Sequence, residues 1–159
     1  MEADKLKGMP IVSLADGARL GRIGEVLFET QPLRVAALRA AGDGQGFVIP
    51  FAQLTHIGAD AVTVESGQVT QTASKEGAFS GLPSLGELTK FKVVDEAGTL
   101  VGTISGLALD PATGQVTGIA LHKGGMLGLG GTTTTIDPAA IRGVGDALLT
   151  VVTGGAPSA

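Results

Sequence analysis

Short apolar runs rich in Val, Ile, Leu and Thr alternate along the chain with polar, glycine-containing breaks. Breaks that recur about every ten residues are typical of the strands and turns of an all-β barrel or sandwich. In the first half the pattern predicts strands at 11–14, 19–29, 33–39, 47–49 and 61–64, with a helical turn at 50–54. In the second half it predicts strands at 91–94, 99–109, 115–122, 132–136 and 148–152, with a helical turn at 138–141.

The two halves repeat one pattern. Early positions of each half match at a spacing of 81 residues and later positions at 87, so the second copy carries a six-residue insertion. Such self-similarity indicates a duplicated structural unit. The alternation of both long strands breaks at equivalent points, near Gly24 and near Ser105, which predicts a β-bulge in each. The matched pairs include Gly17/Gly98, Gly21/Gly102, Ile23/Ile104, Val35/Val116, Ile49/Ile136, Gly58/Gly145 and Val64/Val151.

Five glycines are expected to have structural roles. Gly17 and its equivalent Gly98 lie in the first hairpin turn of each copy, where glycine tolerates a positive φ. Gly114 ends the turn DPATG in the second copy, whereas the corresponding turn ETQP of the first copy lacks glycine and must be built differently. Gly21 and Gly102 lie inside strands, where glycine costs stability unless the backbone needs a close approach or an unusual φ.

The order of these elements, with the segments LGRIGEVLFE and VGTISGLALDPATGQVTGIALHKGGMLGLGG, resembles the PRC-barrel domain in both halves. The resemblance implies an all-β fold of two small, partly open barrels in tandem, each with a short helical turn. We place the first copy at 1–65, a linker at 66–85, the second copy at 86–152 and a flexible tail at 153–159.

The same resemblance implies an adaptor function. PRC-barrel domains form the cytoplasmic part of the photosynthetic reaction-centre H subunit and the C-terminal domain of the ribosome maturation factor RimM. The chain shows neither the membrane helix of the first protein nor the N-terminal domain of the second, so neither set of partners is carried over.

Composition narrows the class further. With 43% hydrophobic residues among 159, the chain has enough apolar material for a core, yet no apolar run approaches the roughly 18 residues of a membrane helix. The charged N-terminus lacks the apolar centre of a signal peptide, so we expect a cytoplasmic protein without a membrane span. The lack of cysteine excludes disulfides and thiolate metal sites.

Charge and aromatic content argue against nucleic acid as a partner. The chain has 11 Lys and Arg against 15 Asp and Glu, for a net charge of −4, and no basic run that would follow a phosphate backbone. There is no Trp or Tyr, and the five Phe residues lie in apolar surroundings that favour core packing over base stacking.

No motif supplies a catalytic or cofactor site. The glycine-rich segment 124–131 is followed by Thr132 where a P-loop needs Lys, and it leads into a β-branched run where a dinucleotide fold needs a helix. Around Ser80, Ala78 replaces the first glycine of a nucleophile elbow. His56 and His122 are not equivalent and have no metal-ligand spacing, so we expect no metal, no cofactor and no enzyme.

The acidic residues also favour a structural interpretation. They fall at turns and strand ends, which suits turn formation and solubility, and no carboxylate pair stands apart for acid–base chemistry. The positions concerned are Asp16, Glu25, Glu29, Asp60, Asp95, Asp110 and Asp137.

One feature goes beyond a structural role. The insertion places Met126, Leu127 and Leu129 in a glycine-rich loop, and apolar side chains there must cover something. They either fold over their own barrel or the other copy, or form a surface for a partner or for self-association; membrane contact is a third alternative. We therefore expect a non-catalytic protein-interaction module. Its partner is another protein or, in a homodimer, a second copy of the chain. The alternative is a small-ligand-binding protein that uses the barrel interior or the interdomain cleft.

Overall fold

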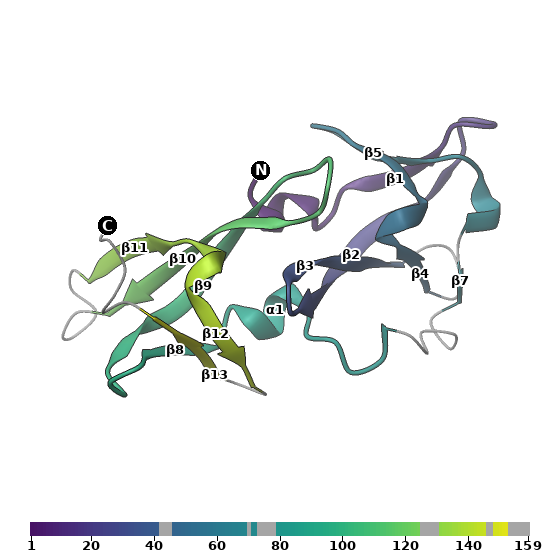
Figure 1. The fold of residues 1–159 in the computed structure, drawn as a ribbon. Coiled ribbons are helices and arrows are strands. Elements are labelled where there is room, and N and C mark those ends of the chain that lie inside the picture. The colour runs from purple at the N-terminus through teal and green to yellow at the C-terminus, as the bar shows by residue number, and fades with distance from the viewer. Residues whose placement is uncertain (42–45, 70, 73–78, 125–130, 146–147, 153–159) are drawn as a thin grey trace.

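The computed structural model describes residues 1–41, 46–69, 71–72, 79–124, 131–145 and 148–152. The fold is all-β, with two small, partly open barrels in tandem, each built around one sheet. The two lobes lie side by side in Figure 1, and the short helix α1 (Leu85–Leu88) lies between them. The expected tail, 153–159, falls outside the described residues.

The first sheet has the strand order β5-β6-β1-β2-β3-β4-β7. Neighbouring strands run antiparallel, except that β1 and β6 are parallel. A 3₁₀ helix, η2 (Phe51–Gln53), follows β4, and Pro50 stands at its N-cap. The strands are β1 (Pro10–Ser13), β2 (Arg19–Thr30), β3 (Leu33–Ala41), β4 (Phe47–Pro50), β5 (Leu54–Ile57), β6 (Val62–Val64) and β7 (Gln71–Thr72).

The second sheet, with order β11-β10-β9-β8-β13-β12, repeats this arrangement. Here β8 and β13 are the parallel pair, and the 3₁₀ helix η7 (Pro138–Ala140) occupies the place of η2. The strands are β8 (Lys92–Asp95), β9 (Leu100–Leu109), β10 (Val116–Lys123), β11 (Thr132–Ile136), β12 (Ile141–Val144) and β13 (Leu148–Val151).

The expected bulges are present in both long strands. The register of β2 on β3 shifts between Ile23 and Glu25, and the register of β9 on β10 skips Ser105. The sequence pattern missed β5 and β12, which are short strands with half-exposed, mixed residues. The turn between β2 and β3, which lacks glycine, contains a cis peptide bond between Gln31 and Pro32.

The expected linker, 66–85, contains regular structure. Residues Gly67–Val69 form the 3₁₀ helix η3, and β7 adds to the edge of the first sheet. Further on, Phe79 packs against Leu27, Ala37 and Val48 on the outer face of that sheet. Part of this segment therefore belongs to the first barrel.

The larger apolar cluster of the described residues spans both copies. The fully buried side chains include Ile23, Phe28 and Leu38 from the first copy and Ile104, Leu107 and Ile119 from the second, and all belong to one contiguous cluster. A barrel of about 60 residues buries only some 60% of its unfolded surface, so sharing a core compensates for small size.

Each copy begins with a short helical segment that docks on the other copy. The 3₁₀ helix η1 (Ala3–Leu6) precedes β1, but Glu2 bridges to Ala108 of β9, and the Leu109 N–H donates to the Met1 carbonyl at 2.8 Å. In the same way α1 precedes β8, but Ser84 bridges to Leu27 of β2. The exchange ties the two barrels together in both directions.

The side chains of the two helical segments anchor this exchange. Leu6 of η1 and Leu88 of α1 occupy equivalent places, and both are completely buried. The helix α1 is further held by a capping box, in which the Ser84 hydroxyl accepts from the Glu87 N–H at 3.1 Å and the Glu87 carboxylate accepts from the Ser84 N–H at 2.9 Å.

A local twofold axis relates the two copies. Arg34 of β3 bridges to Gln115, and these two positions are equivalent under the 81-residue repeat. Beside them the Val35 N–H donates to the Gly114 carbonyl at 2.8 Å. Because a position meets its own equivalent there, the arrangement has the geometry of an isologous dimer joined into one chain.

Candidate functional site

The histidines of the two copies lie apart. His56 is on β5 of the first sheet and His122 on β10 of the second, and both are exposed. Within the described residues, no group of three or more His, Asp and Glu side chains could hold a metal ion. The structure therefore brings no metal-ligand set together in that part of the chain.

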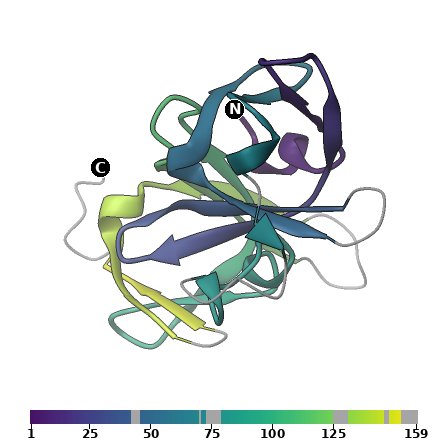
Figure 2. The ribbon, with the colours of Figure 1, turned by 90° about the vertical axis from the view of Figure 1, so that its right-hand side faces the viewer.

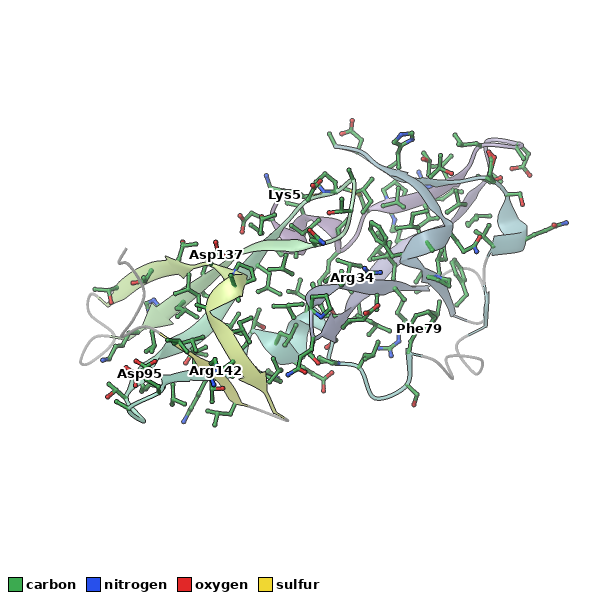
Figure 3. All side chains as sticks on the ribbon, in the orientation of Figure 1. Lys5, Arg34, Phe79, Asp95, Asp137 and Arg142 are labelled. Carbon is green, nitrogen blue, oxygen red and sulfur yellow. The ribbon has the colours of Figure 1, made fainter. Side chains whose placement is uncertain are left out.

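Several of the acidic residues cap tight turns. Asp16 accepts from the Ala18 N–H at 3.1 Å, Asp95 from the Thr99 N–H at 2.9 Å, and Asp137 from the Ala139 N–H at 2.8 Å. The hydrogen bond from Ala18 is the main cause that lowers the pKa of Asp16, because it favours the charged carboxylate. Figure 3 shows Asp95 and Asp137 at separate places on the second barrel, so they do not form a shared acidic site.

The structural glycines fall into two groups. Gly17, Gly98 and Gly114 have φ values of 71°, 83° and 77°, which L-residues rarely adopt. Gly21 and Gly102 instead allow close approach between strands. A Cβ on Gly21 would lie 2.5 Å from the Ala41 carbonyl oxygen, and one on Gly102 would lie 3.0 Å from the His122 carbonyl oxygen.

Several clefts lie between the copies in the described part of the chain, and the local twofold relates two of them to each other. The first, about 480 Å³ in volume, is bounded by the β2–β3 turn with Gln31 and by the segment after β11 with Arg142. Figure 2 shows that hairpin reaching toward η7, and Arg142 is marked on β12 in Figure 3. The second, about 390 Å³, lies between Phe51 and Pro111. Both are shallow spaces between turns.

The outer face of the second sheet exposes two leucines. Leu100 and Leu148 are 41% and 42% exposed. Val94 of β8 pairs with Leu100 of β9. Lys92 lies two residues before Val94, on the same face of β8, and pairs with Leu148 of β13. We call Val94, Leu100 and Leu148 the leucine patch.

The first copy has no such patch. The equivalents of Leu100 and Leu148 in the repeat are Arg19 and Ala61. The sequence analysis missed the leucine patch because both leucines lie in ordinary strand patterns. Comparing the outward-facing positions of the two copies would have found it.

The loop residues Met126, Leu127 and Leu129 lie outside the described residues. The chain enters their segment at the end of β10, Lys123, and leaves it at the beginning of β11, Thr132. The proposed interaction role of these residues therefore stays a prediction.

Comparison with protein families assigns the fold to a family. The PRC-barrel domain model matches residues 1–71 and again residues 84–155. The chain therefore belongs to the PRC-barrel family, as a tandem of two domains. The resemblance inferred from the sequence and the all-β tandem-barrel fold are both confirmed.

Comparisons with solved structures and with curated proteins do not narrow the function further. A solved structure of a 16S ribosomal RNA processing protein, RimM, from Pseudomonas aeruginosa aligns at 12% identity with a TM-score of 0.31, covering 80% of this chain and 76% of that one. A comparison with curated proteins found no match. No helix in the described part of the chain has the length and hydropathy needed to cross a bilayer.

Proposed function

We propose that the chain is a non-catalytic adaptor that binds another protein. The observation that carries the proposal is the leucine patch, which differs between two copies of one fold. Isolated exposed leucines are common on protein surfaces. Here two lie on one sheet face of one copy, on the two strands that flank β8, while the equivalent face of the other copy has Arg19 and Ala61. A difference of this kind supports a surface used by only one of the two barrels.

The rest of the molecule supports a binding platform. The barrel interiors are occupied by one cluster of buried apolar side chains, and the exchanged helical segments hold the barrels together. Such a body presents its outer faces in a fixed arrangement. Covering the exposed part of each patch leucine would contribute about 1 kcal/mol, which suits an interface with a small apolar centre.

The test replaces the patch with the residues of the first copy, in a Leu100→Arg, Leu148→Ala variant. Because both leucines are more than two-fifths exposed, the melting temperature should stay within about 2 °C of wild type. Affinity capture from a lysate of the source organism, quantified by mass spectrometry, should lose the specific partners of the wild-type protein.

The matched control is Leu14→Ser. Leu14 is 52% exposed and lies on the first copy, away from the leucine patch. This variant should capture the same proteins as wild type. Identical captured proteins from all three forms would overturn the proposed function.

A second candidate function is the binding of a small ligand in the cleft between the copies. The observation that favours it is the gathering of Gln31, Gln115 and Arg142 around about 480 Å³, since a few polar groups around a cleft are what ligand recognition needs. A thermal-shift screen against metabolites tests this alternative. A ligand that stabilises wild type but not an Arg142→Ala variant would support it.

We further propose that the adaptor works in the cytoplasm and that nucleic acid is not its partner. The support against nucleic acid is the net charge of −4 and the absence of a basic run in the sequence. We also propose that Met126, Leu127 and Leu129 contribute to partner binding. A triple serine variant should then lose partners at an unchanged melting temperature, whereas a large drop in melting temperature would mean that they pack on their own barrel.

A further inference from the structure

The leucine patch lies on a face of the second sheet that also carries positive charge. Lys92 and Val94 are two residues apart on β8, so their side chains point to the same face of the sheet. On that face Lys92 pairs with Leu148 of β13. The Lys92 ammonium group therefore belongs to the same surface as the leucine patch.

Arg142 brings a second positive charge to this face. Ile141 of β12 pairs with the buried Val151 of β13, so Ile141 points inward. Arg142 is the next residue and points outward, because side chains alternate along a strand. Figure 3 shows Arg142 on the second barrel, on the side away from the first barrel. It stands at the border between the outer face and the cleft that it also lines. We call Lys92 and Arg142 the basic rim.

The basic rim has no ionic partner in the described part of the chain. Neither Lys92 nor Arg142 forms an ion pair or a side-chain hydrogen bond there. The strands that build the face, β12, β13, β8 and β9, contain one acidic residue, Asp95. Its carboxylate accepts from two backbone N–H groups of the β8–β9 turn at 2.9 Å, and Glu96 lies in the same turn. The two positive charges are therefore left for a partner to neutralise.

The equivalent face of the first copy carries charge without an apolar centre. Arg19 and Ala61 replace the two patch leucines there, and the exposed Arg22 pairs with Pro10 of β1. Exposed leucines and basic side chains are thus combined on the second copy alone among the described residues of these two faces. A partner specific for this face must match both features.

The size of the face favours a helix as the occupant. Four strands at a spacing of about 4.8 Å make the face about 14 Å wide, which is close to the diameter of one helix, about 10–12 Å. Helices cover the faces of sheets in layered folds, whereas an extended peptide pairs with a free strand edge. An amphipathic helix presents its apolar residues as one stripe with polar residues on either side.

We propose that this face binds an amphipathic helix of a partner protein, with an aliphatic stripe on the leucine patch and Asp or Glu residues against the basic rim. The proposal rests on the proposed function and names the chemistry of the partner. An acidic flank complements Lys92 and Arg142, whereas a basic flank is repelled by them.

An anionic membrane would match the same charges, but the number of charges is too small for it. Recognition of anionic lipids uses clusters of about four to eight Lys or Arg residues. The four strands of this face contain two, Lys92 and Arg142. A protein helix therefore fits the face better than a lipid surface does.

Fluorescence anisotropy with labelled peptides of about 15 residues tests the proposal on the full chain. One peptide has leucines at helical spacing flanked by Glu, a second has Lys at every Glu position, and a third has the composition of the first in scrambled order. Wild type should bind the Glu-flanked peptide about tenfold more tightly than either of the others. Added salt should weaken this binding, because it screens exposed charges.

Reversing the charges of the basic rim should reverse the preference. The variant Lys92→Glu, Arg142→Glu should bind the Lys-flanked peptide more tightly than the Glu-flanked one. The matched control is Lys5→Glu, Arg19→Glu, which changes the net charge by the same amount at exposed residues of the first copy. Figure 3 shows Lys5 on a different side of the molecule from Arg142, so the control should keep the wild-type preference.

Three outcomes would overturn the proposal. The first is equal affinity of wild type for all three peptides. The second is a control variant that loses as much binding as the charge-reversed variant, because the effect would then come from net charge alone. The third is binding to vesicles of phosphatidylserine and phosphatidylcholine that depends on Lys92 and Arg142, without peptide binding, since the face would then belong to a membrane.

These outcomes are separate from those of the proposed function. Captured proteins that depend on the leucine patch, together with no preference among the peptides, would sink only the acidic-helix proposal. Preference for the Glu-flanked peptide, together with captured proteins that do not depend on the leucine patch, would sink only the adaptor proposal.

Discussion

Replacing Gly21 with alanine would add one methyl group at a point where the backbone leaves no room for it. The new Cβ would lie 2.5 Å from the carbonyl oxygen of Ala41 and 3.1 Å from the ring of Phe47. The ring can turn aside, but the carbonyl is part of the backbone of β3. The strands β2 and β3 would therefore have to separate locally.

The expected cost follows from two opposing effects. Overpacking that forces a backbone shift costs typically about 1–3 kcal/mol, while alanine gains about 0.5–1 kcal/mol over glycine in a strand. We expect a net loss of about 2 kcal/mol for Gly21→Ala, or roughly 4–8 °C in melting temperature for a chain of this size. At Gly102 the nearest backbone atom would be 3.0 Å away, so Gly102→Ala should cost at most about 1 kcal/mol.

Urea unfolding followed by far-UV circular dichroism measures these differences, since the chain has no Trp or Tyr for fluorescence. The matched control is Gly124→Ala, because no atom of the described residues beyond its chain neighbours lies within 4 Å of the Cβ that it adds. The control should stay within about 0.5 kcal/mol of wild type. The reasoning is refuted if Gly21→Ala is as stable as the control, or if Gly102→Ala is the more damaging change.

Three further outcomes are expected. Leu88→Ala should lower the free energy of unfolding by about 2–4 kcal/mol, since Leu88 is completely buried; a loss below about 1 kcal/mol in urea unfolding would contradict its anchoring role. Phe79→Ala should cost about 1–2 kcal/mol by the same assay, because it uncovers the cluster around Val48, and an unchanged midpoint would show that this cover is dispensable. For Asp16, an NMR titration should give a carboxyl pKa below its ordinary value, so its contribution to stability is present above the unfolded-state pKa and is lost as pH falls through the folded-state pKa; a midpoint at or above the ordinary value would contradict this.

Local features of the sequence predicted the local structure. The strand β11 begins and ends at the predicted residues, because a β-branched run between Gly131 and the Asp137-Pro138 pair leaves few alternatives. The bulges at Gly24 and Ser105 followed from the broken alternation of apolar residues. In contrast, β5 and β12 have no apolar run, and they form because a neighbouring strand supplies the hydrogen bonds.

Contacts between the copies could not be predicted in this way. The sequence placed the N-terminal residues with the first barrel, yet Glu2 pairs with Ala108 of the second. No local pattern encodes that pairing, because it depends on two segments far apart in the chain. The leucine patch was missed for a related reason, since a sheet face is formed by residues from three strands.

The interdependence of the two copies is tested most directly by separating them. Residues 1–71 and 84–159 would be produced as two chains, and amide NMR spectra recorded for each alone and for the mixture. Each half alone loses the segment that the other copy supplies, and each is small for an independent barrel, so each should give a poorly dispersed spectrum. Mixing them should restore a dispersed spectrum like that of the intact chain. Two halves that are each well dispersed and as stable as the intact chain would contradict the shared core.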